Sequence, residues 1–213
     1  SVSGLGDVYK RQILPQQQVL RDVLDAHASA VVCQAEDLPR TLSTLNTPPR
    51  IVITDSQAFG QVSRDTPESV PLTSFSILMA RAKGNLSAIA AGAMAADHLQ
   101  DGDRILVSEG CTHHRQCGDI GTVKLPAWLK KHSGRQLEFD FTSGTDFPEQ
   151  LEQYAMVVHC GGCMLNEREM QSRSERAAAQ NVPMTNYGIA IAYMHGILKR
   201  SVAPLPDIAK LLE

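Results

Sequence analysis

Two short segments of the sequence hold the residues with the most distinctive chemistry. The first, SEGCTHHRQCGDIG, contains Cys111, His113 and Cys117, and the second, HCGGC, contains Cys160 and Cys163. Thiolates and imidazoles this close in sequence can bind a metal, pair as catalytic groups or oxidise to a disulfide. Each of these uses needs different partners, so the chemistry depends on which other segments the fold brings to them.

Strands and helices are expected to alternate along the chain, and they determine how the cysteines are positioned. Short Val- and Ile-rich runs predict buried strands, and amphipathic periodicity predicts the helices between them. The expected strands lie at 29–34, 49–56, 104–110, 136–141, 155–162 and 183–188. The expected helices lie at 13–27, 36–45, 75–84, 85–100, 122–134, 147–154, 166–180 and 189–200. This order is typical of an α/β fold, here two small α/β domains with mainly parallel sheets flanked by helices.

The parallel sheets predict that the two cysteine segments meet. Ligands of open α/β sheets lie beyond the carboxyl ends of the strands, where Cys111 follows one expected strand and Cys160 closes another. The glycines between Cys160 and Cys163 let both sulfurs face one ion or cluster. With Cys111 as a third thiolate and His113 as a fourth ligand, one metal position would stay exchangeable, as uptake and release of a second metal fragment require.

The composition of the chain argues against several classes of protein. The chain has 213 residues, of which 43% are hydrophobic, so it can bury the core of one large or two small domains. A net charge of -3 and an aromatic content of 5% argue against a nucleic-acid partner. The longest nearly apolar run, 86–96, is too short to span a membrane. Five cysteines, an odd number in a chain of this size, favour reduced thiols and a cytoplasmic setting.

The beginning of the chain differs in character from the rest. Residues 1–12 show no apolar period and are interpreted as a non-native or adapter-like leader, which implies that an upstream part of the protein is missing. After this leader, the first half carries more apolar helix and strand surface than a domain of its size can bury alone. Such a surface favours a homodimer.

The motifs around the cysteines resemble those of one known family. The pattern is C-T-H, 46 residues and C-G-G-C, with EGCTHHRQC, DIGTVKLP, HCGGCMLN and VPMTNYGIAIAYMHGIL around it and VITDSQAF and PLTSFSILMARAKG upstream. From Ile13 onward the chain is similar to hydrogenase maturation factor F, the scaffold GTPase that matures FeFe-hydrogenase. The resemblance implies a GTP-binding domain upstream, a dimerisation domain at 13–100 and a cluster-binding (tetramerisation) domain at 101–213.

The resemblance also implies a metal site and a function as a carrier. A 4Fe-4S cluster would be held by Cys111, Cys160 and Cys163, with His113 as a candidate fourth ligand and His159 either orienting the ligands or replacing one. The family carries a diiron precursor of the hydrogenase active site, the H-cluster, and delivers it to apo FeFe-hydrogenase. Its other partners are the radical-SAM hydrogenase maturases, and it forms homodimers that pair into tetramers through the cluster domain.

GTP hydrolysis is not expected of these residues. GTP and Mg belong to the first domain of the family, and the sequence contains no G-x-x-x-x-G-K-[ST] phosphate loop. The resemblance therefore implies that this fragment is not an enzyme, whereas the full-length family member is a GTPase.

Other uses of the same residues stay open. Cysteine and histidine ligands also suit a structural zinc site, and a C-x-x-C at a strand end suits a thiol-disulfide oxidoreductase. A third alternative is a dimerisation fragment with an empty site. Iron distinguishes these alternatives, because an iron-sulfur protein is brown whereas zinc and dithiol forms are colourless.

Several other residues have simpler explanations. Cys33 is expected to be a small buried hydrophobe, Cys117 a bystander and His114 an orienting group, whereas Glu109 is a carboxylate that could join the ligands. The charges of residues 166–176 are expected to solvate a helix face through i,i+4 pairs.

Overall fold

Two parallel β-sheets form the frame of the molecule. The computed structural model describes residues 13–83, 86–110 and 119–205. The larger sheet has four strands in the order β4-β3-β5-β6, and the smaller sheet pairs β1 with β2. All pairings between these described strands are parallel, which confirms the predicted α/β class. The strands are β1 (Val52–Thr54), β2 (Leu72–Ser74), β3 (Arg104–Glu109), β4 (Glu138–Ser143), β5 (Met156–His159) and β6 (Met184–Asn186).

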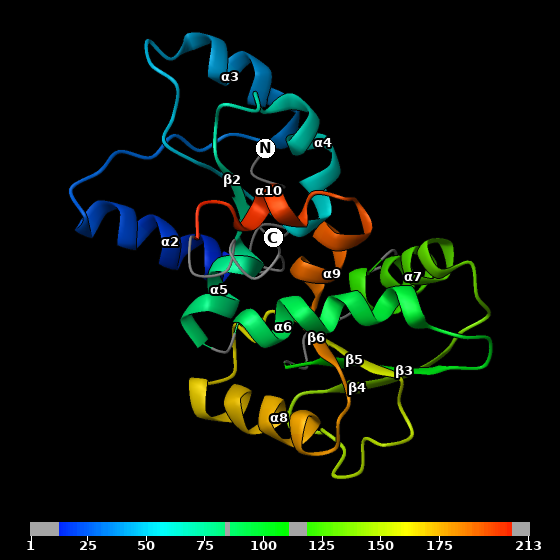
Figure 1. Ribbon diagram of the computed structural model, residues 1–213. Coiled ribbons are helices and arrows are strands. Elements are labelled where there is room, and N and C mark those ends of the chain that lie inside the picture. The colour runs from blue at the N-terminus through cyan, green and yellow to red at the C-terminus, as the bar shows by residue number, and fades with distance from the viewer. Residues whose placement is uncertain (1–12, 84–85, 111–118, 206–213) are drawn as a thin grey trace, which may run out of the picture.

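Helices pack on both faces of the larger sheet (Figure 1). Helix α8 covers one face, and α6, α7 and α9 cover the other. The helices are α2 (Ile13–Asp25), α3 (Leu38–Thr44), α4 (Phe59–Asp65), α5 (Phe75–Lys83), α6 (Leu86–Ala93), α7 (Leu125–Ser133), α8 (Glu167–Ala179), α9 (Tyr187–Met194) and α10 (Leu198–Val202). With one exception, the predicted helices are present with shifted ends or a break.

The central strands β3 and β5 are buried on both faces. All residues of β5 are buried, and in β3 only the first residue is exposed. Leu106 and Val157 face α8, whereas Ile105 and Val158 face the core that the other helices complete. Because successive residues of a strand point to opposite faces, a strand covered on both sides must be apolar at nearly every position. The sandwiched position of these strands explains their continuous apolar runs.

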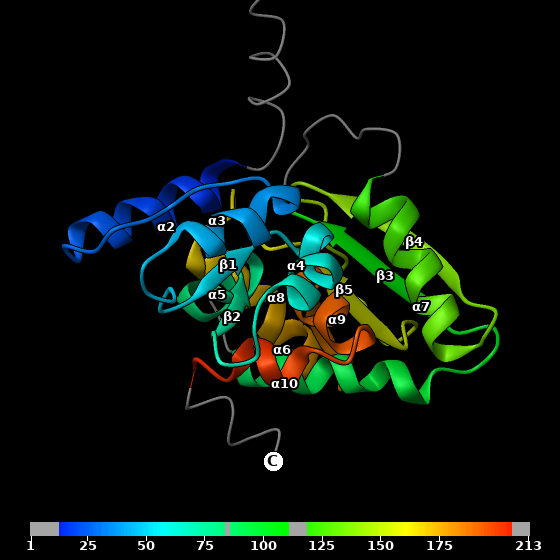
Figure 2. The ribbon, with the colours of Figure 1, turned by 90° about the horizontal axis from the view of Figure 1, so that it is seen from above.

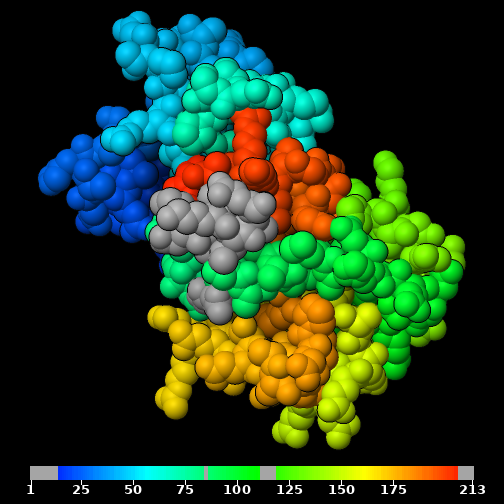
Figure 3. Space-filling model, in the orientation of Figure 1, coloured from blue at the N-terminus to red at the C-terminus, as the bar shows by residue number. Residues whose placement is uncertain are grey.

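The two halves of the chain share one hydrophobic core. Phe59 and Leu72 from the first half belong to the same buried cluster as Ile189 and Val202 near the C-terminus. Helix α9 leads from the larger sheet toward the smaller one (Figure 1), and α10 packs against β2. On the surface, the red and orange C-terminal segment lies between the cyan first half and the green segment of α6 (Figure 3). Arg200 of α10 donates to main-chain carbonyls at the end of α4 and just beyond it. The C-terminal helices therefore hold the two sheets together.

Helix α6 lies very close to strand β6. A Cβ atom added at Gly92 would lie 2.7 Å from the carbonyl carbon of Met184, so this approach requires glycine. Two residues separate the end of helix α5 from the start of α6. The packing of α6 on the sheet therefore also holds the end of α5 near the carboxyl edge of the larger sheet.

The strand predicted at 29–34 is absent. These residues form an irregular segment that is exposed to solvent, with Val31 63% and Val32 74% accessible. The prediction that Cys33 is buried is also wrong, because its side chain is exposed. Val-rich runs favour an extended backbone, but a strand also needs a neighbouring edge to bond. Among the described residues, β1 pairs only with β2, and the segment 29–34 pairs with neither strand.

The helix predicted at 147–154 is also absent, and turns take its place. Side chains of α8 and of the residue after it bind the main-chain groups that a helix would pair internally. Gln180 accepts from the amide of Leu151 (2.6 Å) and donates to the carbonyl of Glu149 (2.8 Å). Arg176 donates to the carbonyls of Phe147 and Pro148. These long-range bonds replace the local bonds on which helical periodicity depends.

In the part of the chain that the structure describes, no helix has the length and apolar character needed to cross a bilayer. The predicted leader at 1–12 lies outside the described residues.

Candidate functional site

The two cysteine segments meet at the carboxyl edge of the larger sheet. Strands β3 and β5 are neighbours, with Ser108 opposite His159, so the residues that follow both strands emerge side by side. The amide of Cys160 donates to the carbonyl of Ser108 (2.8 Å), and the amide of Gly110 donates to the Cys160 sulfur (3.0 Å). Gly110 directly precedes Cys111. The start of the first segment therefore lies against the first cysteine of the second.

Two main-chain amides point at the sulfur of Cys160. Besides Gly110, Gly162 directs its N–H at this sulfur, at 3.4 Å, and the Cys160 side chain is buried. Gly162 has φ 61°, a conformation that favours glycine, and a Cβ there would lie 3.2 Å from Cγ of Met170 and force that side chain to shift. Amide donors aimed at a sulfur stabilise its thiolate form, which is the form that binds a metal.

Cys163 is half-buried three residues further along the loop. Burial raises the pKa of its thiol, the nearby Cys160 raises it further, and Lys83 acts in the opposite direction. Without a metal the thiol therefore keeps its proton at neutral pH. A cation that binds both sulfurs would displace this proton, as metal binding to cysteine generally does.

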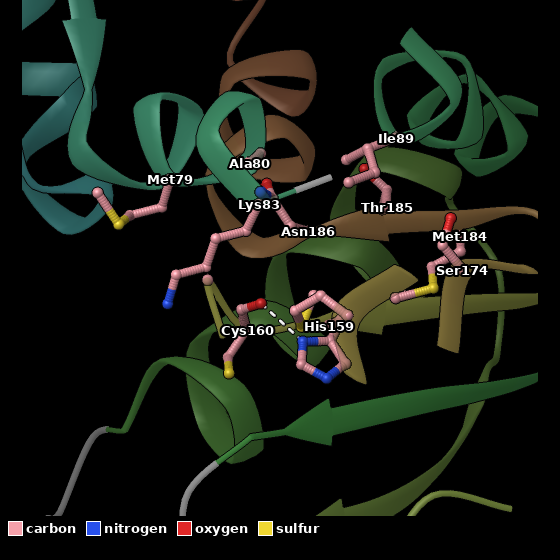
Figure 4. Close-up of a pocket in the computed structure, with 12 residues that line it drawn as sticks. Met79, Ala80, Lys83, Ile89, His159, Cys160, Ser174, Met184, Thr185 and Asn186 are labelled. Carbon is pink, nitrogen blue, oxygen red and sulfur yellow. Dashed lines mark hydrogen bonds between the residues drawn. The ribbon is translucent and has the colours of Figure 1, made fainter. Parts of the chain in front are cut away.

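Lys83, the last residue of α5, extends toward the loop that begins at Cys160 (Figure 4). Its ammonium donates to the carbonyl oxygens of Gly162 (3.2 Å), Cys163 (3.1 Å) and Leu165 (3.0 Å). The sequence interpretation gave Lys83 no role. No local signal marks it, because its partners lie about 80 residues away in the chain.

A small cavity lies between this lysine and the sheet. It has a volume of about 20 Å³, and Met79, Lys83, His159, Cys160 and Asn186 contribute to its lining (Figure 4). A cavity of this size suits a single water molecule. It is too small for an organic substrate.

The other predicted ligands fall outside the described residues. These are Cys111 and His113, together with the nearby His114 and Cys117. Within 13–83, 86–110 and 119–205, no three His, Cys, Asp or Glu side chains are placed to hold a metal ion. The described part of the candidate site is thus the pair Cys160 and Cys163, with Gly110 beside it.

Two family models match the chain. The Hydrogen maturase F dimerization domain matches residues 8–84, and the Hydrogen maturase F tetramerization domain matches residues 87–204, which is more than half of the chain. The chain belongs to the hydrogen maturase F family. This result confirms the resemblance found in the sequence and assigns the chain to hydrogenase maturation. A comparison with curated proteins gave no match.

The lysine contact joins the two hydrogen maturase F segments. Lys83 lies in the segment that the dimerization model matches, and the C-x-x-C loop lies in the segment that the tetramerization model matches. The three bonds from Lys83 therefore connect one family segment to the C-x-x-C loop of the other.

In this hydrogen maturase F chain, both ring nitrogens of His159 are engaged. Nδ1 lies 2.7 Å from the carbonyl oxygen of Cys160, and Nε2 lies 3.1 Å from a guanidinium nitrogen of Arg173. A guanidinium only donates, so Nε2 must accept and Nδ1 must carry the proton. His159 is fully buried. It therefore donates to the main chain of Cys160, and to bind a metal it would have to break one of these bonds.

Arg173 lies behind His159 and is 1% exposed. It also donates to Glu169 (2.9 Å) and to the carbonyl of Gly144 (2.8 Å), and its guanidinium lies 5.0 Å from the centre of the Phe147 ring. The sequence interpretation placed Arg173 on a solvated helix face. The i,i+4 pair with Glu169 is present, but the arginine is buried because its other partners come from β5 and from the loop after β4.

Glu109, at the end of β3, is buried beside Tyr187. The Tyr187 hydroxyl donates to Oε1 of Glu109 at 3.3 Å. Burial, and then the charge of Glu109, raises the pKa of Tyr187 above its usual range. Tyr187 therefore stays neutral and remains a hydrogen-bond donor to this carboxylate, which lies two residues before Cys111.

Proposed function

We propose that this chain is the part of a hydrogenase maturation scaffold that holds a 4Fe-4S cluster and passes on a diiron precursor of the H-cluster. Cys111, Cys160 and Cys163 would be the cluster ligands, and His113 the candidate fourth. The observation that carries the proposal is the hydrogen bond from Gly110 to the Cys160 sulfur, because it brings the two cysteine segments together. When bound, the cluster would supply an iron with one exchangeable ligand.

The described donor set fits such a cluster. Cubane clusters are held by thiolates, and hydrogen bonds to their sulfurs and the surrounding charge tune them. Cys160 receives two amide donors, and the loop that carries both cysteines is held by a cation. We assign His159 to orienting Cys160 rather than to replacing a ligand, because both of its ring nitrogens already have partners.

The wider role follows from family membership. Delivery of the diiron precursor to apo FeFe-hydrogenase, cooperation with radical-SAM maturases and a cytoplasmic location are parts of the proposal. GTP hydrolysis with Mg is also part of the proposal. It would belong to another domain of a parent protein and not to the two matched domains. Both matched domains are named for oligomerisation.

Anaerobic reconstitution with iron and sulfide tests the proposed function. The expected result is about four iron atoms per chain and the paramagnetic resonance signal of a reduced cubane cluster. A chain that binds no iron but takes up one zinc ion tightly would make the site structural. In that case the carrier function would be wrong.

A surface for the proposed homodimer lies at the start of the chain. Helix α2 lies at the end of the molecule away from α7, and the segment after it runs back along the molecule from that end (Figure 2). Leu24, Val31 and Val32 are 61%, 63% and 74% exposed there, within the segment matched by the dimerization model. Large apolar side chains exposed on one segment of a dimerization domain favour contact with another protein surface, and we propose that a second copy covers them.

Replacing Val32 by Asp is therefore expected to weaken the dimer. A carboxylate in an apolar interface must be desolvated, so we expect the dissociation constant to rise at least tenfold, about 1.4 kcal/mol. Sedimentation equilibrium would measure it. Thr41→Asp, in α3, is the control with the same new charge. An unchanged dissociation constant in the Val32 variant would place the dimer surface elsewhere.

A further inference from the structure

The C-x-x-C loop is fastened by one ammonium group. Lys83 has three N–H bonds to give, and three carbonyl oxygens of the loop lie within 3.0–3.2 Å of its nitrogen. These carbonyls belong to Gly162, Cys163 and Leu165, which are the second glycine of the motif, its second cysteine and a residue just beyond it. The lysine therefore binds the main chain of the loop rather than a side chain.

This contact orients the peptide groups of the loop. With its carbonyl turned toward the ammonium, Gly162 directs its own N–H at the Cys160 sulfur. The left-handed conformation of Gly162 allows its N–H and C=O to serve these two partners. The loop thus presents amide hydrogens on the side of the sulfur and carbonyl oxygens on the side of the lysine.

We propose that Lys83 is a positioning residue of the metal site, which holds the C-x-x-C loop in its binding conformation and places a positive charge beside the two thiolates. The inference rests on the proposed cluster function. Two thiolates that share a metal centre repel each other, and a cation nearby offsets part of that repulsion. Because Lys83 lies in α5, the positive charge of a residue in the dimerization segment acts on the cysteines of the tetramerization segment.

The charge and the loop geometry have separable consequences. If Lys83 only held the loop, its loss would speed the release of iron without a specific effect on the electronic properties of the cluster. If its charge also acts on the site, its loss should lower the reduction potential, because reduction adds a negative charge that the ammonium stabilises. An arginine keeps the charge but cannot reproduce the three bonds of a compact ammonium.

The experiment compares Lys83→Met and Lys83→Arg with the wild-type chain after anaerobic reconstitution. Lys124→Met is the matched control, because its ammonium also bonds to the other half of the chain, at Gln57, but does not contact the loop. The measurements are the rate of iron loss to a chelator and the reduction potential of the cluster that remains. Circular dichroism of each apo variant checks that it folds.

We expect Lys83→Met to lose iron about 10- to 100-fold faster than wild type and to shift the potential downward. Lys83→Arg should lose iron faster but keep a potential near that of wild type, and Lys124→Met should match wild type in both. Equal rates and potentials in wild type and Lys83→Met would overturn the role of Lys83 and leave the cluster proposal intact. A wild-type chain that binds no iron would instead overturn the proposed function, and this inference with it.

Discussion

Replacing Cys160 by Ala is expected to abolish cluster binding. The variant should fall from about four iron atoms per chain to nearly none after anaerobic reconstitution, because two remaining thiolates cannot hold a cubane. Its amide partners, Gly110 and Gly162, would then point at an apolar methyl group. Iron analysis together with paramagnetic resonance of the reduced protein would measure the loss.

The folding of the variant must be separated from its metal binding. Cys160 is buried, and its replacement removes one core atom and leaves two amides without the weakly accepting sulfur, at a total cost of about 1–3 kcal/mol; circular dichroism of the apo variant checks that it still folds. Cys33→Ala is the matched control, since it removes an exposed thiol at the other end of the chain and should retain the cluster. A Cys160 variant that keeps its iron and its resonance signal would show that the cluster uses other ligands.

Replacing Arg173 by Met should lower the free energy of unfolding by about 2–5 kcal/mol. The buried acceptor Nε2 of His159 would lose its donor, at about 1–3 kcal/mol, and the part-buried carbonyl of Gly144 would lose another, at about 1–2 kcal/mol. Methionine retains the apolar stem that packs near Phe147 but supplies no N–H group. Urea denaturation of the apo chain would measure the change.

The substitution Arg173→Met should also affect the metal site. Without Arg173, the imidazole of His159 can change tautomer, and its hydrogen bond to the Cys160 carbonyl is no longer enforced. We therefore expect the loaded variant to release iron faster than wild type. Arg168→Met, on an exposed position of the same helix, should change the free energy of unfolding by less than about 0.5 kcal/mol. If both variants unfold alike, Arg173 has no structural role.

The main elements around the site could be predicted from local patterns. The apolar runs of β3 and β5 indicate strands buried on both faces, and parallel strands place their carboxyl ends on one edge. The meeting of Gly110 with Cys160 follows from that rule. The spacing of the cysteines and the motifs around them also indicated the family, which the two family models confirm.

The local patterns failed where a distant partner decided the outcome. The Val-rich run at 29–34 has strand character but pairs with no strand within the described residues, and it is exposed. The residues at 147–154 have helical character, but Gln180 and Arg176 take main-chain groups that a helix would pair. In both segments the local sequence favours one secondary structure, but the tertiary surroundings produce another conformation.

The sequence by itself determined the fold class, the family and the identity of the candidate ligands, because periodicity and short motifs are local properties of the chain. The tertiary structure alone decided which side chains support those ligands. Lys83 and Arg173 look like ordinary surface charges in the sequence, yet one holds the C-x-x-C loop and the other is buried behind His159. A long charged side chain finds its partner only after the sheet and its helices have packed, so no local pattern could identify these two residues.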